Sequence, residues 1–170
     1  MNVSDAIRTK HAVRQFTDRP VPDEVIQAIL DAGRRAQSSK NTQPWNFVVV
    51  RERGTLQGLS KCGMWAGHLA GAAFAVALIS PDPAAKWQVA FDLGQAASYM
   101  QLAAWELGVA SCLASIYELE TACYILGVPA DMHFTVAISF GYPAADQTRP
   151  AVVKQGGRRP LTEVVHWEKW

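Results

Sequence analysis

The longest helix expected from the sequence is apolar around most of its circumference, which constrains the fold more than any other segment. It covers residues 86–107, and Gly108 follows where a left-handed residue commonly closes a helix. Its apolar members are Phe91, Leu93, Ala96, Ala97, Met100, Leu102, Ala103, Ala104 and Trp105. A helix of this kind is normally buried on several sides. One small domain would struggle to enclose it, so we expect a partner chain to cover part of it.

Length and composition predict a single domain over residues 1–170. The chain is 49% hydrophobic and 18% charged, which suffices for a sizeable core. The formal net charge is +1, so no global charge attracts nucleic acid or an anionic membrane. We therefore expect neither as a partner.

The cysteines predict a reducing compartment. Cys62, Cys112 and Cys123 are odd in number and lack C-x-x-C spacing, which argues against a disulfide framework or a metal site. The N-terminus does not resemble a signal peptide. The most apolar region, 66–80, is too short and too interrupted by glycine and histidine to span a bilayer. We expect a soluble cytoplasmic protein.

The order of periodic segments predicts an α+β fold, with helices around a mostly antiparallel or mixed sheet. Helices are expected from an N-cap at Ser4 to about residue 10, from Pro22 onward, and at 55–60, 86–107 and 118–126. Strands are expected at 46–51, 73–79, 110–116 and 133–140, the last with clean alternation. The tail 144–160 is polar and is expected to run over a surface.

The loop Ser38-Ser39-Lys40-Asn41-Thr42-Gln43-Pro44-Trp45 carries an unusual number of side-chain donors and acceptors. Pro44 fixes its own φ and biases Gln43 toward an extended backbone, so the polar groups are held in place. Such a loop can hydrogen-bond a flat ligand with many heteroatoms. An ordinary connection between a helix and a strand explains the same residues equally well.

Two basic clusters are candidates for binding a phosphate monoester. The first is Lys10, His11 and Arg14, and the second is Arg158 and Arg159. Solvated surface charge is the competing interpretation for each residue. Motifs for a P-loop, a G-x-G-x-x-G dinucleotide site, an H-E-x-x-H zinc site and a G-x-S-x-G elbow are absent. A bound flavin would need little more than these polar groups, because the cofactor performs the difficult step.

In these polar and basic motifs the chain resembles the nitroreductase-like family of FMN-dependent oxidoreductases, and the resemblance extends over nearly its whole length. The opening K-H-A-V-R-Q-F, followed by R-P-V, is similar to the family's R-R-S-x-R-x-F…P-V, and the loop S-S-K-N-T-Q-P-W to its P-S-x-x-N-x-Q-P-W. Weaker matches are D-L-G at 92–94, L-G-V-P at 126–129, S-F-G-Y-P at 139–143, R-R-P-L at 158–161 and H-W-E-K-W at 166–170.

The resemblance implies a tightly bound FMN and an intertwined homodimer with two FMN sites at its interface, each built from both chains. It implies that Lys10, His11, Ala12 and Arg14 bind the phosphate and ribityl chain, with Arg158 and Arg159 also on the phosphate. Asn41 and Gln43 would contact the ribityl chain and ring, with Ser39 and Lys40 nearby, and backbone groups of Ala114, Ser115 and Ile116 would approach flavin N5. No side chain need act as a nucleophile.

The chain departs from the family pattern at several positions. Ala12 replaces a serine and so lacks one hydroxyl, and Gln37 stands where a proline usually precedes the loop serines. The chain is also shorter than many members. In the segment 61–68, Trp65 and His68 are possible cofactor or substrate contacts, but a buried tryptophan and a surface histidine are the favoured interpretation.

The resemblance predicts an enzyme that passes hydride from NAD(P)H through FMN to an electron-poor acceptor such as a nitroaromatic or quinone. Within the family, specialised flavin chemistry such as dehalogenation or flavin cleavage remains an alternative. A flavin-binding or storage protein with little turnover is the alternative from another class.

Overall fold

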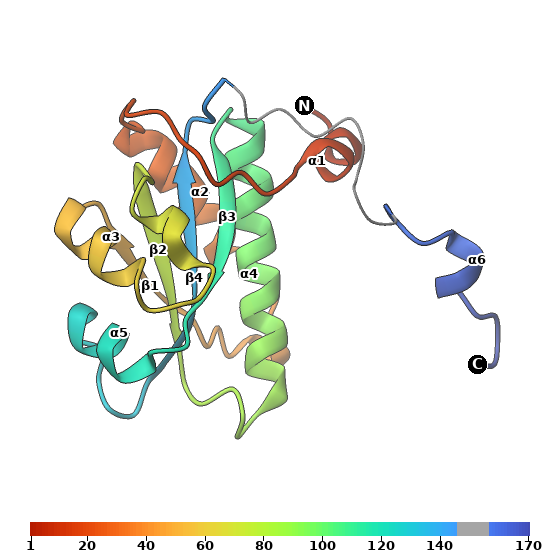
Figure 1. Ribbon diagram of the computed structural model, residues 1–170. Coiled ribbons are helices and arrows are strands. Elements are labelled where there is room, and N and C mark those ends of the chain that lie inside the picture. Colours follow the sequence, from red (N-terminus) through yellow and green to blue (C-terminus); the bar gives the residue numbers. More distant parts are fainter. Residues whose placement is uncertain (146–156) are drawn as a thin grey trace.

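The computed structural model describes residues 1–145 and 157–170, in which a four-stranded sheet lies between two layers of helices (Figure 1). The helices are α1 (Val3–Thr9), α2 (Asp23–Arg34), α3 (Arg53–Leu59), α4 (Trp87–Glu106), α5 (Leu119–Leu126) and α6 (Leu161–Val164). Two 3₁₀ turns are η1 (Ser39–Asn41) and η2 (Ala66–Leu69). The strands are β1 (Asn46–Val50), β2 (Phe74–Ser80), β3 (Ala110–Ser115) and β4 (His133–Gly141).

The sheet has the order β1-β2-β4-β3, and every neighbouring pair is antiparallel. A parallel bridge between Ala12 and Ser111 lays the opening segment along the free side of β3. The register of β2 against β4 shifts between Leu78 and Ile79. The predicted α+β class with a mostly antiparallel sheet is confirmed.

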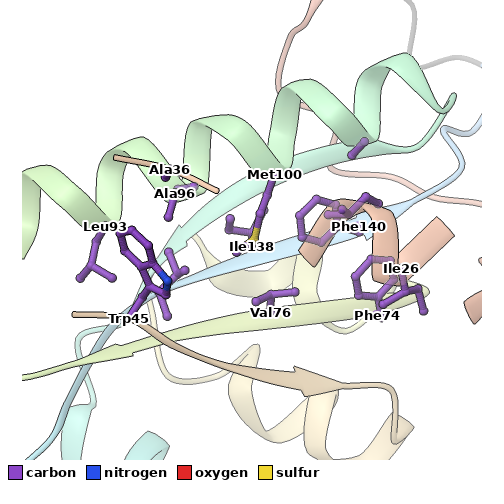
Figure 2. Packing of buried hydrophobic residues seen from close by; sticks show 14 of the residues in the cluster. Ile26, Ala36, Trp45, Phe74, Val76, Leu93, Ala96, Met100, Ile138 and Phe140 are labelled. Atoms are coloured by element: carbon purple, nitrogen blue, oxygen red, sulfur yellow. The ribbon is translucent and has the colours of Figure 1, made fainter. Parts of the chain in front are cut away.

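The two faces of the sheet carry separate hydrophobic clusters. Helices α2 and α4 cover one face, where Met100 of α4 packs toward Ile138 and the Phe74 and Phe140 rings stack 4.8 Å apart (Figure 2). Helices α3 and α5 and the turn η2 cover the opposite face. The sheet therefore provides a support whose β3 side is lined by the opening segment.

The helix ends show how far local sequence signals hold. Asn2, and not the predicted Ser4, caps α1, and its side-chain oxygen accepts a hydrogen bond from the Asp5 amide at 2.9 Å. Pro22 is the residue before α2, outside its first turn. Gly108 closes α4 with φ of 75°, as predicted. The remaining elements agree with the predicted ranges to within about two residues, whereas η1, η2 and α6 were not predicted.

Large apolar side chains of α4 and of the C-terminal segment are exposed among the described residues. The α4 helix exposes Trp87 and Phe91 near its start, and Tyr99 further along. Residues 157–170, with α6, stand apart from the sheet and from α4 (Figure 1), and they expose Trp167 and Trp170. The predicted surface tail 144–160 falls mostly outside the described residues. Within the described ranges, no helix is long and apolar enough to cross a membrane.

Candidate functional site

The opening segment is attached to the sheet through its main chain. The Val13 amide donates to the Ser111 carbonyl at 3.1 Å, and the Thr17 amide donates to the Tyr142 carbonyl at 2.9 Å. The Val13 side chain is buried, whereas its neighbours Ala12 and Arg14 are exposed. Backbone pairing therefore places Arg14 on the exposed side of this segment, at the edge of the sheet.

The start of this segment lies beside the C-terminal end of α4. The His11 ring meets the edge of Trp105 at 5.0 Å, and the Trp105 indole donates to the Thr9 hydroxyl at 2.9 Å. Burial lowers the pKa of the Lys10 ammonium, and neighbouring Cys112 opposes that shift. The ion pairs found within residues 1–145 and 157–170 include neither Lys10 nor Arg14. Their charges are thus free to meet an anion.

Residues 62–68 fold over the far end of β3. The Cys62 carbonyl accepts hydrogen bonds from the amides of Tyr117 and Glu118, at 2.8 and 3.0 Å. Gly63 passes so close to the Ser115 carbonyl that a Cβ at Gly63 would overlap its oxygen. Close backbone approach of this kind is what glycine permits. The result is an open hollow of about 660 Å³, lined by Arg14, Gln15, Met64, Trp65, Gly67 and His68.

The structure reverses the favoured interpretation of Trp65 and His68. Trp65 is 75% exposed, and His68 is only 8% exposed. The reason is the turn η2, which directs His68 onto the sheet, where its Nδ1 lies 2.8 Å from the Ser139 hydroxyl. Both residues line the hollow beside Arg14. The prediction of a buried tryptophan and a surface histidine was wrong.

The polar loop adopts an uncommon backbone conformation. Lys40, Asn41 and Gln43 have φ values of 52°, 55° and 47°, in the left-handed region. The extended backbone expected at Gln43 was therefore wrong, because contacts within the loop override the bias from Pro44. Such left-handed residues cost of order 1–3 kcal/mol each, persist only where their surroundings fix them, and cluster at functional sites. Two side-chain acceptors help to hold this loop: the Ser39 amide donates to the Asp92 carboxylate at 3.0 Å, and the Gln43 amide donates to the Ser38 hydroxyl at 2.9 Å. Main-chain bonds from residues 41 and 42 to residues 38 and 39 close the turn.

Asp92 is the residue that the sequence reasoning missed as a site component. It is 3% exposed on the largely apolar helix α4, and its partner Ser39 is distant in sequence. A carboxylate flanked by apolar residues, Phe91 and Leu93, was the available signal. Beside it lies a hollow of about 460 Å³, lined by Ser39, Lys40, Thr42, Pro44, Pro81, Lys86, Gln88, Val89 and Asp92. An adjoining hollow reaches Trp87 and Phe91.

The predicted site residues form two groups within one chain. We call Lys10, His11, Arg14, residues 62–68 and residues 114–116 the sheet-edge half, and residues 38–43 with Asp92 the loop half. The halves contact opposite ends of α4, at Trp105 and at Asp92. These two positions lie about 20 Å apart at roughly 1.5 Å per residue. The hollows of one half include no residue of the other.

The other predicted site residues lie at the end of β3 and on the C-terminal segment. Ala114 is buried, Ser115 is exposed at the end of β3, and Ile116 follows with its amide bonded to the Thr135 carbonyl at 3.0 Å. They therefore belong to the sheet-edge half. Arg158 and Arg159 are exposed, and they belong to residues 157–170, the segment that stands apart from the sheet (Figure 1).

Known proteins share both the sequence pattern and the fold. The pattern of the Nitroreductase family matches residues 7–61 and 56–142. A protein of Archaeoglobus fulgidus, provisionally named an NADH dehydrogenase/NAD(P)H nitroreductase, is 29% identical and covers 96% of each chain. The NADH dehydrogenase of Thermus thermophilus is 26% identical over 98% of this chain and 96% of its own. The structure of an FMN-dependent nitroreductase from Clostridium difficile superposes with a TM-score of 0.84 at 27% identity, covering 97% and 98% of the two chains.

Proposed function

Since the chain belongs to the Nitroreductase family, we propose that it is an FMN-dependent oxidoreductase that takes electrons from NAD(P)H and gives them to an electron-poor acceptor. The names of the relatives and the FMN dependence of the Clostridium difficile protein support this assignment. The observation that carries it is the pair of half-sites, each with the polar chemistry that one part of FMN requires. When bound, FMN accepts hydride from NAD(P)H and reduces an acceptor such as a nitroaromatic or quinone.

The residues present fit the cofactor. In the sheet-edge half, Lys10 and Arg14 are cations without ion-pair partners in the described chain, which suits a phosphate or a flavin carbonyl. Gly63 lets residues 62–68 approach β3 closely, because a Cβ there would overlap the Ser115 carbonyl oxygen, and the hollow beside Arg14 depends on this packing. Asn41 and Gln43 supply amide donors and acceptors from a loop held in a fixed shape. We propose that Arg158 and Arg159 add charge at the phosphate.

We propose that the cofactor site is completed by a second copy of the chain. A two-fold axis makes a contact reciprocal, so it can place the loop half of each chain against the sheet-edge half of the other. The exposed aromatics of α4 and of residues 157–170 supply apolar surface for such a contact. Two identical sites follow from one interface, and neither exists in the isolated chain.

In this arrangement the protein's residues bind and orient the cofactor. Arg14 and Lys10 hold its anionic and carbonyl oxygens, while Asn41 and Gln43 fix the ribityl chain and ring. We assign to Lys40 the task of stabilising negative charge on the reduced ring, because fixed cations favour charge that develops during a reaction. No side chain serves as a nucleophile.

The absorbance spectrum of the purified protein tests the proposal. We expect flavin bands in the protein as isolated, or after FMN is added, and a dimer by size-exclusion chromatography. NADH or NADPH added without oxygen should bleach the bands, and a nitroaromatic should restore them. A colourless monomer that takes up no FMN would contradict the proposal. Bound FMN that no nicotinamide reduces would instead indicate a flavin-binding protein with little turnover.

A further inference from the structure

The hollow beside the loop half carries more positive than negative charge. Lys40 lines it from the polar loop, Lys86 lines it from the position before α4, and both side chains are exposed. Among the described residues, no ion pair includes either lysine. Asp92 supplies the carboxylate of the lining, but it is 3% exposed and accepts from the Ser39 amide. An anion that enters the hollow therefore meets two lysines with which no carboxylate is paired.

The other polar groups near this hollow do not cancel that charge. Thr42 and Gln88 line it with a hydroxyl and an amide, and both groups can donate to an oxygen. Asp82 lies in the connection before Lys86 but outside the lining, and its carboxylate accepts from the Ala84 amide at 2.8 Å. The first turn of α4 contains no acidic residue. The lining therefore suits a carboxylate or a phosphate group.

The cofactor leaves part of this charge without a role. In the proposed function, basic residues of the sheet-edge half and of the C-terminal segment bind the FMN phosphate, and Lys40 faces the reduced ring. Lys86 has no part in that arrangement, although it lines the same hollow as Lys40. Because Lys40 adjoins Asn41 and Gln43, which hold the ring in that proposal, a co-substrate lying on the flavin would lie next to this hollow.

We propose that Lys86, together with Lys40, binds an anionic group of the co-substrate that lies on the flavin ring. This inference rests on the proposed function. The group is a carboxylate or a phosphate, carried by the electron acceptor, as in a nitrobenzoate, or by the electron donor, as in the 2′-phosphate of NADPH. Lys86 is then a specificity-determining residue, because it favours the charged member of a pair of co-substrates that react alike.

Two pairs of co-substrates test the proposal. The acceptors 4-nitrobenzoate and 4-nitrobenzamide differ in a negative charge, and so do the donors NADPH and NADH. The ratio of kcat/KM within each pair is compared between proteins, so the intrinsic reactivities of the compounds cancel. Lys86→Gln should lower the preference for the charged member of at least one pair about two- to fivefold, the effect of one exposed ion pair. The pair that changes identifies which co-substrate carries the group.

Two variants and the salt dependence separate charge from structure. Lys86→Arg keeps the charge and should retain the wild-type ratios. Lys61→Gln removes an exposed lysine that follows α3 on the opposite face of the sheet, and it should also retain them. The wild-type preference should shrink as salt is added, because salt screens exposed charges, whereas the ratios of Lys86→Gln should respond less.

Three results would overturn the inference. The first is that Lys86→Gln leaves the ratios of both pairs unchanged. The second is that Lys86→Gln loses the preference of the apoprotein for FMN over riboflavin, which would place Lys86 on the cofactor phosphate. These two results leave the proposed function standing. The third is that the wild type transfers electrons from neither donor, which overturns the proposed function and this inference with it.

Discussion

The two halves of the candidate site are held by different forces. The sheet-edge half is built on main-chain pairing: Val13 bonds to Ser111, and the Cys62 carbonyl joins residues 117 and 118. The loop half has only short-range main-chain bonds, from residues 41 and 42 to residues 38 and 39. Two side chains, the carboxylate of Asp92 and the hydroxyl of Ser38, add further bonds to a backbone with three left-handed residues. Backbone pairing tolerates side-chain replacement, whereas the loop depends on particular atoms. Substitutions should therefore act on the halves unequally.

The largest expected effect tests whether the halves of one site come from two chains. Arg14→Ala damages the sheet-edge half, and Asp92→Ala damages the loop half. Each homodimer should lose FMN from both of its sites. A heterodimer of the two variants, purified through two different affinity tags, should have one doubly damaged site and one intact site. We expect it to bind one FMN per dimer with wild-type affinity, measured by flavin absorbance and fluorescence titration.

A site built from one chain predicts the opposite result for the heterodimer. If both halves of a site belonged to the same chain, every site in the heterodimer would carry one substitution. Binding would then be no better than in the homodimers, and the proposed two-chain site would be wrong. A heterodimer of wild-type and Arg14→Ala chains is the control, and it should also bind one FMN in both arrangements.

The next largest effect concerns the carboxylate that anchors the loop. A hydrogen bond to a charged group contributes about 1.5–3 kcal/mol. Asp92→Ala should therefore weaken FMN binding roughly 10- to 100-fold, because the Ser39 amide loses its acceptor. Asp92→Asn keeps an oxygen of similar shape and should lose less. Dissociation constants from fluorescence titration decide this.

An acidic residue elsewhere on α4 serves as the matched control. Glu106 is exposed at the opposite end of the helix and contacts the N-terminal amine at 3.4 Å. Glu106→Ala should leave FMN affinity nearly unchanged. Equal losses in Asp92→Ala and Glu106→Ala would show that α4 stability, and not the loop contact, governs binding.

The sequence predicted the sheet well because its strands carry local signals. The alternation of Phe134, Val136, Ile138 and Phe140 correctly marks β4. It does not reveal the register shift beside Leu78, which leaves Phe134 in the opposite hydrophobic cluster from Ile138. A register irregularity is set by pairing between distant strands, so the pattern within one strand cannot contain it.

The site was predicted less completely because its geometry depends on contacts between distant residues. The sequence marked the polar loop, but its anchor Asp92 lies 53 residues beyond Ser39. It marked the segment 61–68, but the orientation of Trp65 and His68 is set by the unpredicted turn η2. In the proposed two-chain site, the grouping of the basic clusters also depends on how the chains are arranged, which composition and periodicity do not determine.

Gly63 tests the main-chain packing of the sheet-edge half. A methyl group at this position would overlap the Ser115 carbonyl oxygen, so Gly63→Ala must move residues 62–68 away from β3. Overpacking of this kind costs typically about 1–3 kcal/mol. We expect a loss of that size in the free energy of unfolding, measured by denaturant titration of the apoprotein, and weaker FMN binding. Gly71→Ala, where a Cβ meets no atom within 4 Å, is the control and should be nearly neutral.

The smallest expected effect measures the backbone cost of the loop half. Lys40 has a φ of 52°, and a left-handed residue with a Cβ costs roughly 1–2 kcal/mol more than a right-handed one. Glycine avoids that cost, although it adds chain entropy to the unfolded state. Lys40→Gly and Lys40→Ala both remove the ammonium and differ only at Cβ. The glycine variant should therefore have the larger free energy of unfolding, by up to about 1 kcal/mol, measured by denaturant titration. Both variants should weaken the binding of reduced FMN equally. If alanine proved the more stable, the left-handed loop would be absent from the protein in solution.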